Sequence, residues 1–241
     1  MGSNARAALA ARHGDVDPGG RRQKRRRRAK DSPSLVAAVD ERRERILKVA
    51  EQLFFQNGYS GTTMEMIVQA LGVTKPYVYY YFRSKQAIFE TLCWRPTVAC
   101  FTALEFPDDD RRPAHEKLAA GLEHLVRETI AHYPAAFFTH KEPSVLTPEF
   151  RAKQLDLAHR FYDQMDALLE QARRDGNANF DDTRLTSLAA CSLPGFLFTW
   201  YRPDGRLPAE DVVRELSKLV YRVLGLRIRA RPRKPARSGP R

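Results

Sequence analysis

The chain lacks the features on which most enzymes and membrane proteins depend. It contains no GxSxG, no P-loop motif, no GxGxxG after a predicted strand and no HExxH. Its six histidines are scattered, and no apolar run approaches the roughly 18 residues that a membrane span needs. We therefore expect neither an enzyme nor a membrane protein, and we expect no cofactor.

Cysteine is also scarce. Cys93, Cys100 and Cys191 are far apart and form no CxxC pair, so their spacing fits neither a metal site nor a disulfide framework. The N-terminus has no apolar stretch of the kind that a signal peptide contains. These absences predict a cytoplasmic protein with reduced thiols and no metal site.

The net charge of +12 is concentrated at the two ends of the chain. Residues 1–34 contain ten Lys or Arg and three Asp, and residues 226–241 contain seven Lys or Arg and no acid, which leaves −2 for the rest. We expect a disordered Arg-rich extension over residues 1–39 and a basic disordered tail over residues 227–241. The run RRQKRRRRAK, residues 21–30, either adds phosphate contacts to a neighbouring DNA-binding module or has no role.

A helix-turn-helix signature occupies residues 61–85. Thr62 or Thr63 is suited to cap a helix, and Gly72 is suited to end it in a left-handed conformation. Pro76 then falls in the first turn of a second helix, where its missing N–H is no loss. A further helix over residues 40–57 would complete a three-helix DNA-binding domain over residues 40–87.

The second helix of this motif has more aromatic residues than one buried stripe can hold. Val78 and Phe82 make the inward stripe, so some of the tyrosines at positions 77 and 79–81 must face outward. Tyr80 either packs against neighbouring helices or presents its hydroxyl to the DNA backbone. Lys85 begins the next helix, where a cation is favourable only if an anion such as a phosphate binds there; the alternative is a solvated lysine.

The remaining sequence predicts only helices. Apolar residues recur at helical spacing over residues 114–133, 149–174, 183–201 and 209–224, with a break at Pro194. Pro96 is predicted to kink or end the helix before it. The two apolar helices within residues 183–224 either form a four-helix bundle with a second copy of the chain or are buried in one monomer.

Aromatic residues between positions 94 and 200 outnumber what a tight helical core usually needs. They predict either an ordinary core or a pocket for a small apolar or aromatic effector, since such pockets are lined mainly by aromatic side chains with a few polar groups. The candidate effector-binding residues are Trp94, Phe101, Phe137, Phe138, His140, Phe161, Tyr162 and Phe196.

The stretch GYSGTTMEMIVQALGVTKPYVYYYFRSKQAIF resembles the DNA-binding domain of the TetR family of bacterial regulators. The similarity rests on the double Thr, the LGVT turn, the YxYF helix and the SK that follows. It implies an all-α homodimer in which a helix-turn-helix domain precedes a larger ligand-binding and dimerisation domain, here residues 88–226. By position, it implies DNA contacts from Thr63, Lys75, Tyr77, Tyr79, Tyr81 and Lys85.

Taken together, these features predict a ligand-responsive transcriptional regulator of the cytoplasm and nucleoid. The leading hypothesis is a repressor that binds a near-palindromic operator in double-stranded DNA as a homodimer through residues 183–224 and is released by a small effector. The alternative is a DNA-binding regulator controlled by a protein partner, or an activator, with no small-molecule effector.

Overall fold

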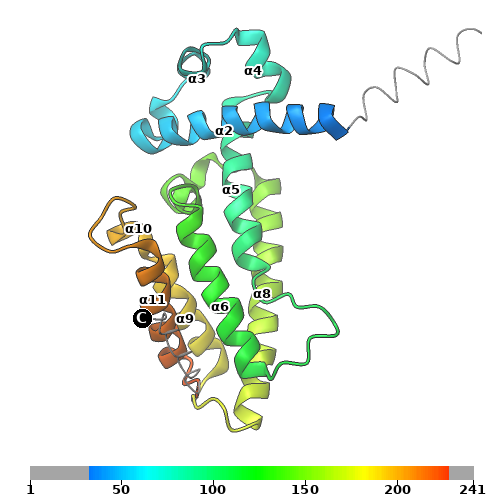
Figure 1. The fold of residues 1–241 in the computed structure, drawn as a ribbon, viewed down its shortest axis with the longest axis vertical. Coiled ribbons are helices and arrows are strands. Elements are labelled where there is room, and N and C mark those ends of the chain that lie inside the picture. The colour runs from blue at the N-terminus through cyan, green and yellow to red at the C-terminus, as the bar shows by residue number, and fades with distance from the viewer. Residues whose placement is uncertain (1–32, 228–241) are drawn as a thin grey trace, which may run out of the picture. The chain divides into compact units, whose positions relative to one another are not determined.

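The structure, a computed structural model, describes residues 33–227 and the side chains of residues 39–227. These residues belong to two compact units, one ending at Ile46 and the other beginning at Leu47. Within the described range the long elements are all helices, joined by turns and loops (Figure 1). One isolated β-bridge in this range joins Ala178 to Leu226. The all-α prediction is therefore confirmed. The predictions for residues 1–32 and 228–241 lie outside the described residues.

Helix α2, Pro33–Gly61, begins earlier than the sequence suggested. We expected residues 33–39 to belong to a disordered extension, but they form the first turns of this helix. Proline is favourable in a first helical turn, and Ala37 and Ala38 are strong helix formers, which explains the longer helix. Near its other end, Gly58 adopts φ 71°, a left-handed conformation that suits glycine.

Two short helices follow as predicted. Helix α3 spans Met64–Leu71 and helix α4 spans Lys75–Tyr81, with Gly72 in the left-handed conformation (φ 65°) between them. Val78 and Phe82 are buried, as the inward stripe required.

Helix α5, Lys85–Phe101, continues through Pro96, where we predicted a kink or an end. The proline removes one backbone hydrogen bond, yet Pro96 and its neighbours Cys93 and Thr97 are buried on this helix. The Thr97 hydroxyl donates to the Cys93 carbonyl at 2.8 Å, which adds a hydrogen bond inside the helix. Burial of this face therefore outweighs the local preference to break.

The larger helical region is arranged around helix α6, Ala114–Ala131, which packs against α5, α8, α9 and α11 (Figure 1). The bounds of the other long helices are α8 Pro148–Arg174, α9 Thr183–Gly195 and α11 Ala209–Val223. The short α10, Leu197–Trp200, follows the predicted break at Pro194 and Gly195. Leu118 and Leu122 of α6 and Met165 of α8 are among the fully buried residues of this core.

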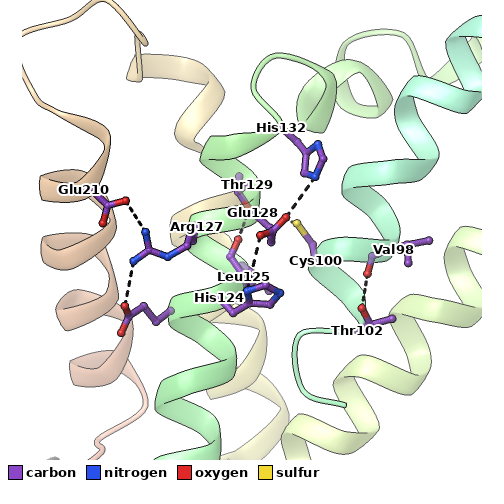
Figure 2. A network of polar contacts seen from close by, with 11 residues as sticks. Val98, Cys100, Thr102, His124, Leu125, Arg127, Glu128, Thr129, His132 and Glu210 are labelled. Atoms are coloured by element: carbon purple, nitrogen blue, oxygen red, sulfur yellow. Dashed lines mark hydrogen bonds and ion pairs between the residues drawn. The ribbon is translucent and has the colours of Figure 1, made fainter. Parts of the chain in front are cut away.

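Between α6 and α8 lies a segment of short helices, residues 134–147, which we call the junction segment. It contains η1 Ala135–Phe137, α7 Phe138–Lys141 and η2 Pro143–Val145. These short helical turns satisfy part of the backbone of the segment. Helix α6 is also joined to α11 by a hydrogen bond that Arg127 donates to Glu210 at 2.5 Å (Figure 2).

Helix α6 approaches the turn after α5 very closely at Gly121. A Cβ atom at this position would lie 2.5 Å from Leu104 Cδ2 and 2.6 Å from the Ala103 carbonyl oxygen. Side chains do not tolerate such distances, so the packing of α6 depends on the absence of a side chain at Gly121.

We therefore predict that Gly121→Ala lowers the free energy of unfolding by about 1–3 kcal/mol, the usual cost of overpacking a core. The matched control is Gly195→Ala, because a Cβ there meets no atom within 4 Å. Urea denaturation measures both variants. Equal stability of Gly121→Ala and the parent would contradict the packing of α6 described above.

Candidate nucleic-acid interface and ligand cavity

The α3–α4 motif is held by local hydrogen bonds. The Thr63 hydroxyl accepts from the Met66 N–H at 3.2 Å and caps α3, as the sequence predicted. Thr74 occupies the corresponding position before α4, but its side chain makes no capping bond. Helix α3 therefore ends at Gly72, and a short turn connects it to α4.

Helix α4 presents most of the predicted DNA-contacting side chains. Tyr79 is 40% exposed, whereas Tyr77 and Tyr81 are half-buried and their rings lie 5.3 Å apart. Lys75 is exposed and pairs with Glu65 of α3 at 2.7 Å. Tyr80 is 77% exposed, so of its two predicted placements the structure shows the outward one.

Lys85 lies where the sequence placed it, in the first turn of α5, but its ammonium group points to protein. It donates to the backbone carbonyls of Tyr59 at 2.8 Å and Thr62 at 2.7 Å, and lies 4.1 Å from the centre of the Tyr59 ring. Lys85 thus adds charge-assisted hydrogen bonds to two carbonyls at and just beyond the end of α2, and the Tyr59 carbonyl also accepts from the Thr62 N–H at 3.3 Å. Two of its three N–H donors are therefore used within the protein.

A cavity of about 190 Å³ lies among α5, α6, α8, α9 and the junction segment. Its wall is largely apolar and aromatic. The lining residues are Pro96, Thr97, Cys100, Phe101, Leu125, Thr129, Ala136, Phe137, Thr139, His140, Gln154, Phe161, Tyr162, Cys191, Pro194 and Gly195.

Five of the eight candidate effector residues meet at this cavity: Phe101, Phe137, His140, Phe161 and Tyr162. They come from separate segments of the chain, which only the folded structure brings together.

The other three candidates lie outside the cavity wall. Trp94 packs edge-on against Phe150, with ring centres 5.7 Å apart. Phe138 is buried against Phe89 on the opposite side of the junction segment. Phe196 is 60% exposed. These three side chains do not line the cavity, although each is near a lining residue in sequence, because direction along a helix changes by ~100° per residue.

Several lining residues were missed by the sequence reasoning. Thr97, Cys100, Thr129 and Gln154 carry no motif, and polar residues on a helix are more often solvated than cavity-lining. One signal was present: Thr97 lies four residues before Phe101, so the two share a helical face.

The titratable groups of the cavity wall are held in their neutral forms. Burial raises the pKa of Cys100 to about 11 and that of Cys191 to about 12. Burial likewise raises the pKa of Tyr162 to about 12. Partial burial of the His140 imidazole at the cavity rim lowers its pKa below the ordinary value. Figure 2 shows Cys100 reaching across to Thr129 of α6, with Sγ and Oγ1 3.5 Å apart.

The junction segment also contacts the helices next to the α3–α4 motif. The Gln86 amide of α5 donates to the Val145 carbonyl at 2.7 Å, and the Thr147 N–H donates to the Glu90 carboxylate at 2.8 Å. The same segment contributes Phe137 and Thr139 to the cavity wall. One face of the segment therefore touches the cavity, and the other touches α5.

An aromatic contact reinforces these hydrogen bonds. The Phe138 ring is stacked on Phe89 of α5 at 5.5 Å and meets Phe54 of α2 edge-on at 6.3 Å. The Tyr59 N–H of α2 also donates, at 3.4 Å, to the Glu142 carboxylate of the junction segment. Movement of the junction segment would therefore displace the C-terminal end of α2 and the N-terminal end of α5.

Across residues 33–227, no cluster of three or more His, Cys, Asp or Glu side chains is placed to hold a metal ion. Figure 2 shows His124 and His132 beside Glu128, each forming an ion pair only if protonated. In this part of the chain no helix is long and apolar enough to cross a membrane.

A helix-turn-helix motif followed by a larger helical region that contains a cavity is an arrangement typical of DNA-binding transcriptional regulators. Two family models agree with this class. Residues 46–92 match the model described as bacterial regulatory proteins of the tetR family, and residues 111–224 match the tetracyclin repressor-like C-terminal domain.

Individual proteins show the same likeness. The TetR family regulator PfmR from Thermus thermophilus is 30% identical, with a TM-score of 0.63, over 73% of this chain and 97% of PfmR. The regulator AcrR from Shigella flexneri is 35% identical over 96 residues, 37% of this chain and 44% of AcrR, so the match covers less than half of that relative. The structure of AibR with isovaleryl coenzyme A and operator DNA shares the fold at 21% identity, with a TM-score of 0.62, over 77% of this chain and 99% of that one.

The chain belongs to the TetR family of transcriptional regulators. The prediction of a regulator without enzymatic activity agrees with this family.

The carbonyl contacts of Lys85 predict a stabilising role for this residue. We expect Lys85→Met to lower the free energy of unfolding by about 1.5–3 kcal/mol, since two charge-assisted hydrogen bonds to backbone carbonyls are lost. The matched control is Lys75→Met, whose exposed pair with Glu65 should leave the stability unchanged. Thermal and urea unfolding distinguish the two variants, and a fully stable Lys85→Met would show that its carbonyl bonds are dispensable.

Proposed function

We propose that this protein is a repressor that binds a near-palindromic operator as a homodimer and is released when a small molecule fills the cavity. The observation that carries the proposal is the junction segment, which lines the cavity on one face and contacts α2 and α5 on the other. A filled, dry core would have favoured control by a protein partner, and the cavity supports a small-molecule effector instead.

DNA binding would rely on hydrogen bonds from α4 more than on charge. Residues 40–90 contain seven Lys or Arg against six Asp or Glu, so this region is nearly neutral. The hydroxyls of Tyr79 and Tyr81 are proposed to donate to phosphates, and Lys75 and Tyr77 to lie near base edges. Thr63 and the remaining N–H of Lys85 would add phosphate contacts. The operator in the AibR complex supports this proposal for the family fold.

The dimer is proposed to form through residues 183–224. Helices α9 and α11 pack against each other, and both leave apolar side chains exposed in the monomer. These exposed side chains are Leu185, Leu188, Leu219 and Val223, joined by Phe196 and Trp200 around α10. Covering them with the same helices of a second copy would remove apolar surface from water at roughly 25 cal/mol per Å². A two-fold dimer then places two α4 helices about 34–36 Å apart on one face of the duplex.

The proposed domain organisation follows the earlier expectation. Residues 40–87 would form the DNA-binding domain and residues 88–226 the effector-binding and dimerisation domain. We propose that the protein acts in the cytoplasm, where its DNA target lies.

The tyrosine hydroxyls provide the first test. We predict that Tyr79→Phe with Tyr81→Phe weakens operator binding about ten- to hundredfold, because two hydroxyl donors to charged phosphates are lost. The operator is first selected by the full chain from random duplexes, which should yield a two-fold symmetric site. Fluorescence anisotropy then compares the variants, with Tyr133→Phe, which lies outside the helix-turn-helix motif, as the control. Parental affinity of the double variant, or an asymmetric selected site, would contradict the proposal.

A second prediction concerns coupling between the cavity and DNA. Gly195 lines the cavity with open space around its missing Cβ, so Gly195→Leu should partly fill the cavity as an effector would. We expect it to weaken operator binding roughly tenfold, within the usual range of allosteric coupling. Adding Gln86→Ala and Glu90→Ala, which remove the two side-chain hydrogen bonds between α5 and the junction segment, should restore most of that loss.

The control for the combined variants is Gln171→Ala, which changes a glutamine on the exposed surface of α8 outside the cavity. It should leave the effect of Gly195→Leu unchanged. The same weakening by Gly195→Leu in all three backgrounds would mean that the junction segment does not carry the signal.

A further inference from the structure

The cavity wall contains no formally charged group at neutral pH. Of the described residues that line it, none is Lys, Arg, Asp or Glu. Its thiols and the Tyr162 hydroxyl remain protonated because burial raises their pKa values. His140, at the rim, is kept neutral by its lowered pKa. The described residues that line the cavity therefore supply no counter-ion to a ligand inside it.

An unpaired charge is costly in such a place. Moving a carboxylate or phosphate out of water without a partner costs several kcal/mol, more than a small ligand can recover from apolar contact. The part of the ligand that enters the cavity must therefore be uncharged.

The size of the cavity limits the ligand further. Its volume of about 190 Å³ is below the ~300–1,000 Å³ typical of pockets for drug-sized compounds. It is slightly above that of an apolar cavity of ~150 Å³ known to hold benzene. One ring with a short substituent, or a branched chain of similar volume, fits this space.

Gln154 of α8 offers a polar group to a ligand in the cavity. The hydroxyls of Thr97 and Thr129 already donate to the Cys93 and Leu125 carbonyls, each at 2.8 Å. By contrast, the side-chain amide of Gln154 has no hydrogen-bond partner within residues 39–227, although it lies in the cavity wall. A half-buried amide offers one donor group and one acceptor, which suit a neutral carbonyl or hydroxyl group.

We propose that the effector is a small uncharged compound of about one ring in size, bound through a single carbonyl or hydroxyl group to Gln154. This inference rests on the proposed function, because it assigns a ligand class to the same cavity. The proposed effector differs from isovaleryl coenzyme A, the ligand in the AibR structure, because the phosphates of that ligand would find no cation among the described residues of the cavity wall.

The test uses matched probes that differ in one chemical property. Acetophenone carries a neutral carbonyl, ethylbenzene lacks it, and benzoate carries a charge on the same ring; cyclohexanone and cyclohexanecarboxylate repeat the comparison without aromaticity. Isovaleryl coenzyme A completes the set. Calorimetry on the DNA-free full chain measures binding, and anisotropy with the selected operator measures release.

We expect the ketones to bind and each carboxylate to bind at least about a hundredfold more weakly. Gln154→Leu should weaken acetophenone binding about five- to tenfold and leave ethylbenzene binding unchanged, because only the ketone loses a hydrogen bond. Gln171→Leu on the same helix is the control, and should change neither. A folding defect would affect both probes equally, so it would be recognised.

Different outcomes would overturn the ligand class, the role of Gln154 and the proposed function. Tighter binding of benzoate or isovaleryl coenzyme A than of the ketones would overturn the uncharged class, and so would binding of none of the probes. A ketone affinity that is insensitive to Gln154→Leu would overturn the role of Gln154. Ketone binding without any effect on operator release would leave the ligand class standing and overturn the proposed function.

Discussion

The structure depends on one buried aromatic ring, Phe89 of α5. Its side chain is fully buried, and its ring meets Phe54 and Tyr59 of α2 and Phe138 of the junction segment at 5.3, 5.0 and 5.5 Å. Aromatic pairs at such distances contribute beyond their buried area, so these elements resist separate movement. Glu90, the residue after Phe89 in α5, accepts a hydrogen bond from the Thr147 N–H of the junction segment. The helices that support the DNA-binding motif are therefore packed against the wall of the cavity.

Charge is distributed in a way that fits this arrangement. The cavity wall is neutral, the region around the helix-turn-helix motif is nearly balanced, and the excess of Lys and Arg lies at the two ends of the chain. Affinity for DNA in general and selection of a site can then be separate properties. The tyrosine helix would contribute geometry and hydrogen bonds, whereas the basic ends would contribute attraction to phosphates. An uncharged effector would alter the geometry without changing the long-range attraction.

Features governed by local chemistry were predicted correctly from the sequence, and features governed by distant packing were not. Gly72 and the cap of α3 gave the helix-turn-helix because a capped, glycine-terminated helix is specified within a few residues. Of the two outcomes predicted at Pro96, an end of the helix is contradicted, since burial of the α5 face outweighs one lost hydrogen bond. Phe138 was predicted to bind the effector because it lies in an aromatic stretch, but its ring is stacked on Phe89. The carbonyl contacts of Lys85 and the position of Gln154 in the wall depend on segments far away in sequence, and no pattern shows them.

The central claim is that the state of the cavity reaches the DNA-binding helices through the junction segment. Hydrogen–deuterium exchange of the full chain, with and without Gly195→Leu, tests it most directly. The account predicts altered exchange both in peptides covering residues 134–147 and in peptides covering the end of α2, residues 55–62, while the α8 core around Met165 is unchanged. Altered exchange confined to the cavity wall, with the end of α2 unaffected, would contradict it.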